Sequence, residues 1–465
     1  MKKHLSMLLV LITILGLSIG YSALNTDLSI SGDAVAKKRN VYTEDILNGT
    51  DPVLQDELIP VIIEDDGTVR KANIYSEWYN YEKQEWANAV ILVNEDTNYN
   101  ANDVIPENNI ESYFVWIPRY KYKIFDEGNY NGLTIKENAE QTIEVIFENK
   151  DTLVSNGTKE GEWLTHPAFT SFDSNGMWVG KFETGTTLTS DYNVRNGNAV
   201  HIKPNLTSWR NIQVANAFYT SYDYKRNLDS HMMKNTEWGA VAYLQHSIYG
   251  SSKEVFSNNN SSYITGYSTN KKPTCGYTGT NEDCNRYCND GSCNSPYNTS
   301  IGYLASTTSN ISGIYDMSGG SWEYVMGVML DETGVPFSGR NEQANSGFKG
   351  NYSDGGTGLL GYDYPSSKYY DSYHYTTLVN DFKTRIMGDA TGEIGPFYNE
   401  TYYGVQRTVS SWYSDYAIYL RQEYVWFLRG GIIGYGTYNG IYAFSNMTGM
   451  NNNSISFRIV LTPKN

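Results

Sequence analysis

Short apolar runs, separated by Asn-, Asp- and Gly-rich stretches, mark the elements of this chain. Such runs predict strands; the one at 113–117 suits a buried strand, and the one at 177–183 alternates. Four runs predict strands, at 60–63 (PVII), 89–93 (AVILV), 113–117 (YFVWI) and 177–183 (MWVGKFE). Near the C-terminus, Ile455, Phe457, Ile459 and Leu461 alternate with other residues, which predicts one strand over 455–461.

Two stretches carry helical spacing. Ser208 is placed to cap a helix with Trp209, Ile212 and Ala215 on one face. A second helix should begin at Asn235 or Thr236. Its expected members are Trp238, Val241, Ala242 and Gln245.

The mixture of strands, few helices and long loops predicts an α+β fold class. Residues 250–300 and 330–415 are Asn-, Ser-, Gly- and Tyr-rich tracts and predict loops. We expect residues 1–24 to be a signal or anchor, 25–40 a stalk, 41–110 a small β-rich lead-in, and 111–465 the main domain.

The N-terminus has the pattern of an export segment. Lys2 and Lys3 precede an uncharged apolar run over 5–24, which is also long enough to span a bilayer. Tyr21 is bulky for a small-x-small cleavage site, so a cleaved signal and a retained membrane anchor both remain open. Either reading predicts that most of the chain lies outside the cytoplasm, at the cell surface or in the medium of a bacterium.

The net charge and the Tyr content limit the kinds of partner that the chain can bind. The formal net charge of the 465 residues is −16, and an acidic chain repels phosphate groups, which argues against nucleic acid as a partner. Only 18% of residues are charged although 41 are Tyr, so we expect an uncharged, Tyr-rich surface.

All four cysteines lie in one stretch, within an insertion at 270–298. Cys275, Cys284, Cys288 and Cys293 predict two disulfides in an exported protein, and three connectivities are open. A zinc knuckle would place its cysteines in C-x2-C pairs, which this stretch lacks. Zinc and free thiols are the alternatives.

Several segments resemble, in chain order, the formylglycine-generating-enzyme-like (sulfatase-modifying factor) branch of the C-type lectin fold. The most specific is Gly313–Val325 (GIYDMSGGSWEYV), which resembles the G-L-Y-D-M-x-G-N-x-W-E-W-V signature of that family. Weaker similarities are at 177–183 (MWVGKFE), 207–211 (TSWRN), 234–238 (KNTEW), 429–431 (RGG) and 457–458 (FR). The resemblance covers roughly 111–465 and implies a C-type-lectin-like fold.

Departures from the family pattern imply a protein without catalytic activity. The oxidase members bind copper through two cysteines after the R-G-G segment, but no cysteine follows Arg429 here. The chain has six histidines, and none are paired at the i, i+4 spacing. The family also has structural calcium sites near N-x-W-E. The resemblance therefore implies a candidate calcium site at Asp316 and Glu323, weakened because Gly320 replaces the Asn. We expect no other cofactor.

The window between Arg429 and Arg458 has the composition of a binding surface. Tyr, Asn, Ser and Gly are the residues of antibody loops, since Tyr offers contact area at low entropy cost. The predicted ligand-binding residues are Tyr435, Thr437, Tyr438, Asn439, Tyr442, Asn446, Met447, Met450, Asn451 and Asn452. The window also resembles the variable region of diversity-generating-retroelement target proteins, which ends in S-F-R-x-x-L as Ser456–Leu461 does. A loop surface without diversification is the alternative.

Taken together, these features predict an exported surface protein that binds an extracellular protein or glycan. Two alternatives remain: a metal-dependent enzyme of the formylglycine-generating type, and a structural component of a pilus or envelope. The Tyr- and Asn-rich window favours binding over the structural role.

Overall fold

The computed structural model describes residues 51–124, 142–257, 297–331, 346–349, 361–374 and 386–462. Short gaps within these ranges lie at 56, 96, 159–160, 189–192, 205, 301, 396, 403–404, 411, 422 and 433–437. All described residues belong to one compact unit, Asn40–Asn465. The predicted export segment, the stalk, the four cysteines, Tyr435 and Thr437 lie outside the described residues. No helix in the described part of the chain is long and apolar enough to cross a membrane.

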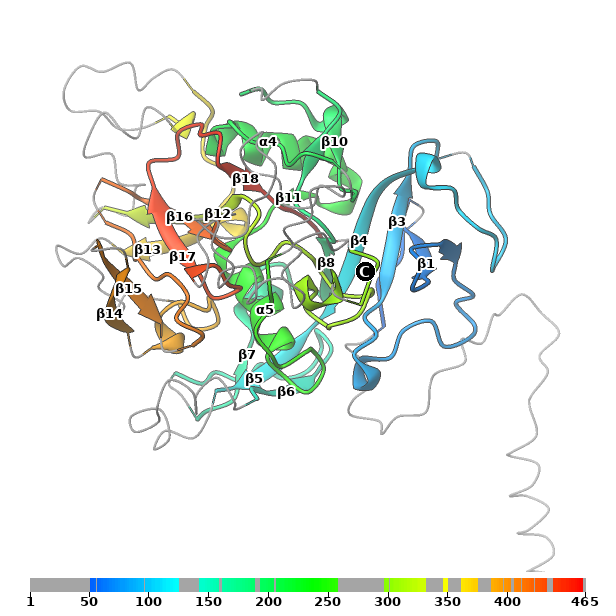
Figure 1. Ribbon diagram of the computed structural model, residues 1–465, viewed down its shortest axis with the longest axis horizontal. Helices are drawn as coiled ribbons and strands as arrows, with labels where there is room; N and C mark the ends of the chain where they lie inside the picture. The colour runs from blue at the N-terminus through cyan, green and yellow to red at the C-terminus, as the bar shows by residue number, and fades with distance from the viewer. Residues whose placement is uncertain are drawn as a thin grey trace, which may run out of the picture. The chain divides into compact units, whose positions relative to one another are not determined.

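A sheet of seven described strands forms one side of this unit, in the order β11-β19-β8-β4-β3-β1-β2 (Figure 1). Its strands are β1 (Ile59–Ile63), β2 (Val69–Lys71), β3 (Asn88–Leu92), β4 (Ile110–Pro118), β8 (Gly176–Gly180), β11 (His231–Met232) and β19 (Ile459–Leu461). Every residue of β3 is buried, as are all but one in β4, which agrees with the continuous apolar runs of their sequences.

The expected boundary at residues 110 and 111 does not separate two units. β3, in the lead-in, pairs antiparallel with β4, and Ala89 lies opposite Phe114. The lead-in therefore supplies three strands to the same sheet as the main domain. The expected boundary was placed by composition, which carries no information on strand pairing, although strands that follow one another along the chain often pair.

A second sheet contains residues from the later part of the chain. Its order is β13-β12-β16-β17, and β18 pairs parallel with β12. The strands are β12 (Trp322–Leu330), β13 (Asp371–His374), β16 (Trp426–Arg429), β17 (Phe444–Met447) and β18 (Ile455–Phe457). β12 is buried at all nine positions and forms the middle of this sheet.

The predicted C-terminal strand is two strands in two sheets. β18 pairs with β12, whereas β19 pairs with β8 and β11, so the chain passes from one sheet to the other at Arg458. The prediction of a single strand over 455–461 was wrong, because both short strands keep the same alternation and periodicity does not identify the pairing partner.

Three α-helices lie in the described residues: α3 (Pro167–Thr170), α4 (Val214–Tyr224) and α5 (Asn235–Gln245). α5 starts where the sequence predicts, and all eleven of its residues are buried. In Figure 1 α5 lies between the strands of the two large sheets. The Tyr120 hydroxyl donates to the Ala240 carbonyl of α5, and the Trp238 indole N–H of α5 donates to the Ile441 carbonyl.

The helix predicted at Ser208 begins later, at Val214. Ser208 forms an antiparallel β-bridge with Gly185, and the Trp209 N–H donates to the Thr184 carbonyl. This stretch is therefore extended. Asn211 has a positive φ of 59°, which also prevents a helix from starting there.

Smaller elements complete the described structure. The remaining strands are β5 (Tyr120–Lys123), β6 (Glu144–Phe147), β7 (Leu164–Thr165), β9 (Gly185–Thr186), β10 (Val200–His201), β14 (Phe397–Tyr402) and β15 (Val405–Ser410). The 3-10 turns are η1 (Tyr81–Lys83), η2 (Glu107–Asn109), η3 (Gly197–Ala199), η4 (Arg226–Leu228), η5 (Gly302–Ala305), η7 (Ser367–Tyr369) and η9 (Gly392–Ile394). The described chain is thus mostly sheet with few helices, in the α+β or mainly β class.

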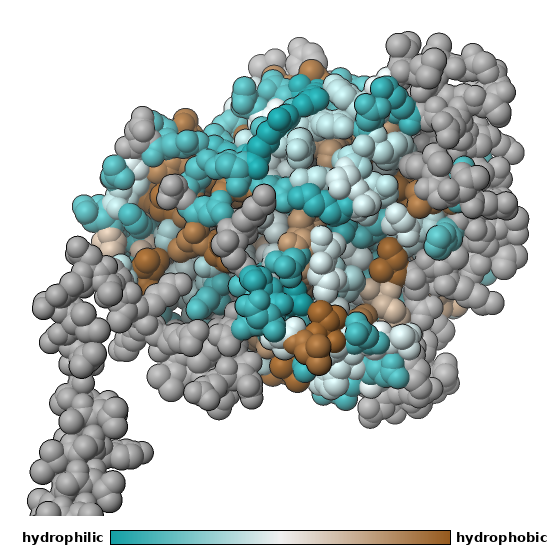
Figure 2. Space-filling view, turned by 180° about the vertical axis from the view of Figure 1, so that it is seen from behind, coloured by the Kyte–Doolittle hydropathy of each residue, from teal (hydrophilic) through white to brown (hydrophobic). Residues whose placement is uncertain are grey.

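The face opposite to that of Figure 1 is mainly hydrophilic. Figure 2 shows its hydrophobic residues in small groups, separated by hydrophilic ones. Isolated apolar residues of this kind are normal on a soluble surface and do not by themselves indicate a binding site.

Replacement of Gly239 by Ala should destabilise the protein, although Ala is ordinarily the better helix residue by about 0.5–1 kcal/mol. A Cβ at Gly239 would lie 1.9 Å from the carbonyl oxygen of Gly388, so the helix or the Gly388 loop must move. We expect Gly239→Ala to lower the free energy of unfolding by about 1–3 kcal/mol in urea titrations followed by Trp fluorescence. An unchanged or higher stability would contradict this close packing.

Candidate functional site

Four residues from three motifs meet in a buried acidic centre, defined here as Glu183, Asp316, Glu323 and Arg458. Arg458 binds both oxygens of Glu323, with Nε–Oε2 at 3.0 Å and Nη2–Oε1 at 2.6 Å. Its Nη1 donates to the Gly180 carbonyl at 2.8 Å. The Arg of the closing F-R segment therefore holds the Glu of the W-E segment and the end of β8.

The acidic centre contains more carboxyl groups than cations. Glu183 accepts the backbone N–H of Ser321 at 2.8 Å and the hydroxyl of Ser208. Burial raises the pKa of Glu183 well above its usual range, and Glu323 and Asp316 raise it further. Burial also raises the pKa of Glu323, and Arg458 only partly offsets that effect.

Lys181 ties the Gly313–Val325 segment to the large sheet. Its Nζ is fully buried and donates to Asn88 Oδ1 at 2.9 Å and to the carbonyls of Ile311 at 2.6 Å and Gly313 at 2.7 Å. Burial lowers the pKa of Lys181 well below its usual range. With three acceptors around it, the Lys181 side chain holds this loop against the large sheet.

Arg429, from the R-G-G segment, also has a role within the fold. Its guanidinium donates to Asn235 Oδ1 and to the carbonyls of Asp389, Ala390 and Ile441, at 3.2–3.4 Å. Burial lowers the pKa of Arg429 to about 10, and it stays protonated at neutral pH. The charged motif residues described above thus bond to one another or to backbone groups.

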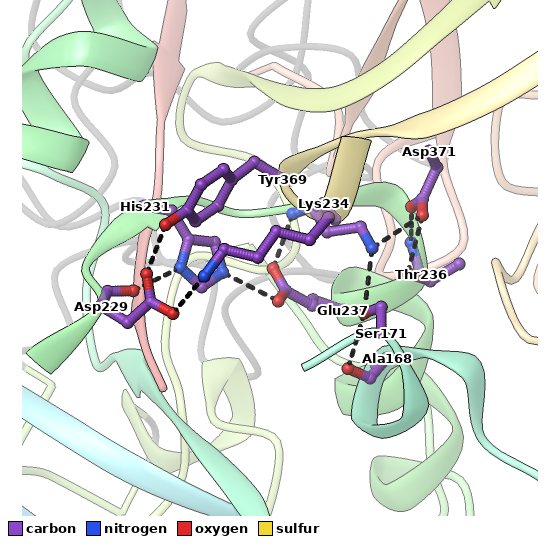
Figure 3. A network of polar contacts seen from close by, with 10 residues as sticks. Ala168, Ser171, Asp229, His231, Lys234, Thr236, Glu237, Tyr369 and Asp371 are labelled. Carbon is purple, nitrogen blue, oxygen red and sulfur yellow. Dashed lines mark hydrogen bonds and ion pairs between the residues drawn. The ribbon is translucent and has the colours of Figure 1, made fainter. Parts of the chain in front are cut away.

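A polar network surrounds the start of α5 (Figure 3). Asp371, from β13, accepts the Thr236 N–H at 2.7 Å and lies 3.2 Å from Lys234 Nζ. Glu237 accepts the Lys234 N–H at 2.8 Å and lies 2.9 Å from His231 Nε2. Two carboxylates therefore meet the helix N-terminus, where the helix dipole favours negative charge.

The same network contains residue types used in catalysis, but its contacts indicate a structural role. Lys234 Nζ lies 3.1 Å from Ser171 Oγ and 3.2 Å from Asp371 Oδ1, so it joins α3's end to β13. His231 Nδ1 lies 2.7 Å from the Asp229 carbonyl, which can only accept, so both ring nitrogens are engaged. No local sequence pattern indicates this network, because Asp371 is far from α5 along the chain.

Three of the predicted ligand-binding residues are buried, and their expected surface position is wrong. Tyr438, Asn439 and Tyr442 are 1%, 3% and 0% exposed. The Tyr442 hydroxyl donates to the Ala242 carbonyl at 3.2 Å. Asn439 Oδ1 accepts the Ile432 N–H at 2.9 Å, which closes the turn after Arg429. Asn439 and Tyr442 therefore complete hydrogen bonds of the core, and the Tyr438 ring packs against Tyr416 and Arg407.

The later predicted residues lie nearer the surface. Asn446 and Met447, in β17, and Asn451 and Asn452 are half-buried, and Met450 is 36% exposed. Met450, Asn451 and Asn452 belong to the C-terminal loop, defined here as Thr448–Ser454 between β17 and β18. The structure therefore brings part of the predicted set together, on a loop shorter than the one expected.

No described group of three or more His, Cys, Asp or Glu residues could hold a metal ion. Both oxygens of Glu323 bind Arg458, so the candidate calcium ligand has another partner in this structure. Calcium at Asp316 and Glu323 remains a prediction, as does the absence of catalytic metal. The predicted disulfides lie outside the residues that the structure covers.

Comparison with known proteins adds no family assignment. No protein-family model matches the chain, and no curated protein matches it. The resemblance to the formylglycine-generating-enzyme-like branch therefore depends on the motifs alone.

Loss of Arg458 should be strongly destabilising, because Glu323 would remain buried beside two other carboxyl groups. We expect Arg458→Met to lower the free energy of unfolding by about 3–5 kcal/mol at neutral pH in urea titrations. The double variant Glu323→Leu/Arg458→Met removes both charges and should recover most of that loss. If the single variant is as stable as the wild type, the ion pair does not hold the two sheets together.

A second buried carboxyl group predicts a pH effect on stability. Glu393 accepts the Gly388 N–H at 2.5 Å and the hydroxyls of Tyr122 and Tyr243, both at 2.8 Å. Burial raises the pKa of Glu393 to about 7 in spite of these donors, and Asp389 also raises it. The folded state therefore holds this proton more tightly than the unfolded chain.

Because this pKa is raised on folding, the stabilisation is fully present below about pH 4.5 and is lost as pH rises through about 7. Between about pH 5 and pH 8, the wild type should lose up to about 3 kcal/mol relative to Glu393→Gln, which cannot ionise. Urea midpoints of both proteins at the two pH values measure this difference. Parallel pH profiles for the two proteins would rule out the effect.

Proposed function

We propose that this protein is a surface-displayed binding protein, without catalytic activity, that uses its C-terminal loop to contact an extracellular protein or glycan. The observation that carries the proposal is the way the backbone of this loop is held. Five of its carbonyl groups, between Gly449 and Ser454, accept hydrogen bonds from the protein around them.

The donors come from two fixed parts of the fold. From the start of α4, the Val214 N–H donates to the Gly449 carbonyl, and from the segment before it the Asn211 N–H donates to Asn452 and Arg210 Nη1 to Asn453, at 2.8–3.1 Å. From β12, the Tyr324 hydroxyl donates to Met450 at 2.8 Å and the Trp322 N–H to Ser454 at 3.0 Å. A loop held in this way has already lost most of its backbone freedom, so less entropy is lost when it binds.

The side chains of this loop suit adaptable contacts. Asn453 and Met450 are exposed, and Asn451 and Asn452 are half-buried. Amides both donate and accept hydrogen bonds, and Met adapts its shape to an apolar partner. Asn451 Nδ2 donates to Asn211 Oδ1 at 2.9 Å, which extends the amide surface onto the segment before α4.

The fold that carries the loop and the cellular location of the protein complete the proposed function. We propose a C-type-lectin-like frame of the formylglycine-generating-enzyme-like kind, which the meeting of the motif residues around the acidic centre supports. The export segment at 5–24 supports display outside the cell, either after cleavage or through an N-terminal anchor. Burial of Tyr438, Asn439 and Tyr442 moves the proposed binding surface to the second half of the predicted window.

Removal of the two exposed loop side chains should weaken binding without unfolding the protein. A panel of purified bacterial and phage surface proteins and polysaccharides, immobilised and probed with the full chain, identifies binders. For each of them, we expect Met450→Ala/Asn453→Ala to lower affinity by about fivefold or more. The free energy of unfolding should change by less than about 1 kcal/mol, because both side chains are exposed.

Leu153→Ala is the matched control, since Leu153 is 91% exposed and lies on a different loop. The control variant should bind as the wild type does. If the double loop variant keeps full affinity for every binder, the C-terminal loop is not the binding surface, and the structural role gains support.

A further inference from the structure

A separate pocket, called here the β1 pocket, opens on residues that no motif includes. Its volume is about 290 Å³, near the lower end of the range for small-molecule sites. It shares no residue with the C-terminal loop. The lining residues are Val61, Ile62, Ile63, Asp65, Glu77, Trp78, Tyr79, Glu85, Trp86, Asn88, Asn310, Ile311 and Ser312.

Hydrogen bonds between the polar lining residues fix their positions. Asn88 Nδ2 donates to the carbonyls of Trp86 at 2.9 Å and Ser312 at 2.8 Å. The Ser312 hydroxyl lies 2.7 Å from Asn310 Oδ1 and accepts the Trp86 N–H at 2.9 Å. Behind them, Lys181 holds Asn88 Oδ1 at 2.9 Å. This part of the lining is preformed, and its amide and hydroxyl groups already have partners.

Aromatic rings form another part of the lining. Trp78 is half-buried and packs edge-on against Tyr79, with centroids 5.0 Å apart. The indole N–H of Trp86 donates to the Tyr249 carbonyl at 2.7 Å, which fixes that ring. Aromatic faces attract cations through the ring quadrupole, most strongly when the ring is Trp.

The charge of the lining is one-sided. Asp65, Glu77 and Glu85 are acidic, and none of the described lining residues is basic. Lys83 pairs with Glu77 at 3.0 Å, and both side chains are partly exposed, so this pair only partly neutralises the lining. The pocket thus repels anions and concentrates cations.

We infer that the β1 pocket binds an organic cation: an ammonium or guanidinium group on a short uncharged stem. The carboxylates pair with the positive charge of the ligand. The rings of Trp78 and Tyr79 pack against its stem or against the face of the cation. An oligosaccharide fits less well, because the amide and hydroxyl groups of the lining are already bonded to one another. The cation can be a free amine or a basic side chain of a peptide.

Calorimetric titration of the full chain tests this inference, with choline and arginine methyl ester as free cations and Gly-Gly-Arg-Gly-Gly as the peptide. 3,3-Dimethylbutanol, the uncharged analogue of choline, is the matched ligand control. We expect millimolar or tighter binding of cations and at least tenfold weaker binding of the uncharged analogue. Tighter binding of the peptide than of the free cations identifies a basic side chain as the natural ligand, and the reverse identifies a free amine.

Variants locate the site. Glu85→Gln and Trp78→Ala should each weaken cation binding about tenfold, and Trp78→Phe, which keeps an aromatic face, should weaken it less. Glu82→Gln is the control, since Glu82 is exposed and lies in η1, outside the lining. Circular dichroism and thermal melting verify that each variant is folded.

Three results would overturn the inference: no binding of any cation at millimolar concentration, equal binding of the uncharged analogue, or affinities unaffected by both Glu85→Gln and Trp78→Ala. Preferential binding of a neutral oligosaccharide in the same pocket would overturn it as well. None of these results depends on the C-terminal loop, so the proposed function stands or fails separately.

Discussion

Complete burial of α5 is the constraint on which the described structure depends. A helix leaves its first N–H groups and its last carbonyls without partners, and here water cannot reach either end. Asp371 and Glu237 serve the N-terminal end. At the other end, the Ser247 hydroxyl donates to the Leu244 carbonyl at 2.7 Å and the Ser252 N–H to the Gln245 carbonyl at 2.8 Å. The hydroxyls of Tyr120 and Tyr442 add hydrogen bonds to the Ala240 and Ala242 carbonyls. β5, β13 and the segment before β17 therefore all bond to α5, which Figure 1 shows between the two large sheets.

The burial of α5 also explains why a high Tyr content did not identify surface residues between Arg429 and Arg458. Tyrosine is abundant in antibody loops, but a Tyr hydroxyl also reaches a buried carbonyl from the end of an apolar ring. Tyr442 does this for α5, Tyr81 for the Trp116 carbonyl and Tyr315 for the Tyr297 carbonyl. Tyr324 does the same for Met450, from the core side of the C-terminal loop. Many of the tyrosines are therefore hydrogen-bonding members of the core, and a window rich in Tyr is not necessarily a surface.

Local patterns predicted the elements, and pairing between distant residues decided the rest. The runs at 60–63, 89–93 and 113–117 became β1, β3 and β4, and α5 begins at Asn235 as its spacing predicts. The turn of the chain from one sheet to the other at Arg458 depends on Glu323, 135 positions earlier, and no periodicity carries that information. For the same reason the Asp371 cap of α5 and the lining of the β1 pocket could not be predicted. The candidate site was predicted only in its later half, where exposed Asn and Met residues follow β17.

The two candidate surfaces differ in the physical origin of their selectivity. The C-terminal loop between Gly449 and Asn453 carries no charged side chain, so its contacts depend on shape and on amide hydrogen bonds, which salt hardly screens. The β1 pocket has three carboxylates at a partly exposed site, where salt screens attraction at distances beyond about 8–10 Å. The buried guanidinium groups of Arg429 and Arg458 are held by carbonyls and by Glu323, and neither residue lines the pocket or the loop. Lys181 lies behind the pocket, where its Nζ donates to Asn88 Oδ1 and the Ile311 carbonyl. An uncharged loop and an acidic lining can therefore select ligands of different charge on one chain.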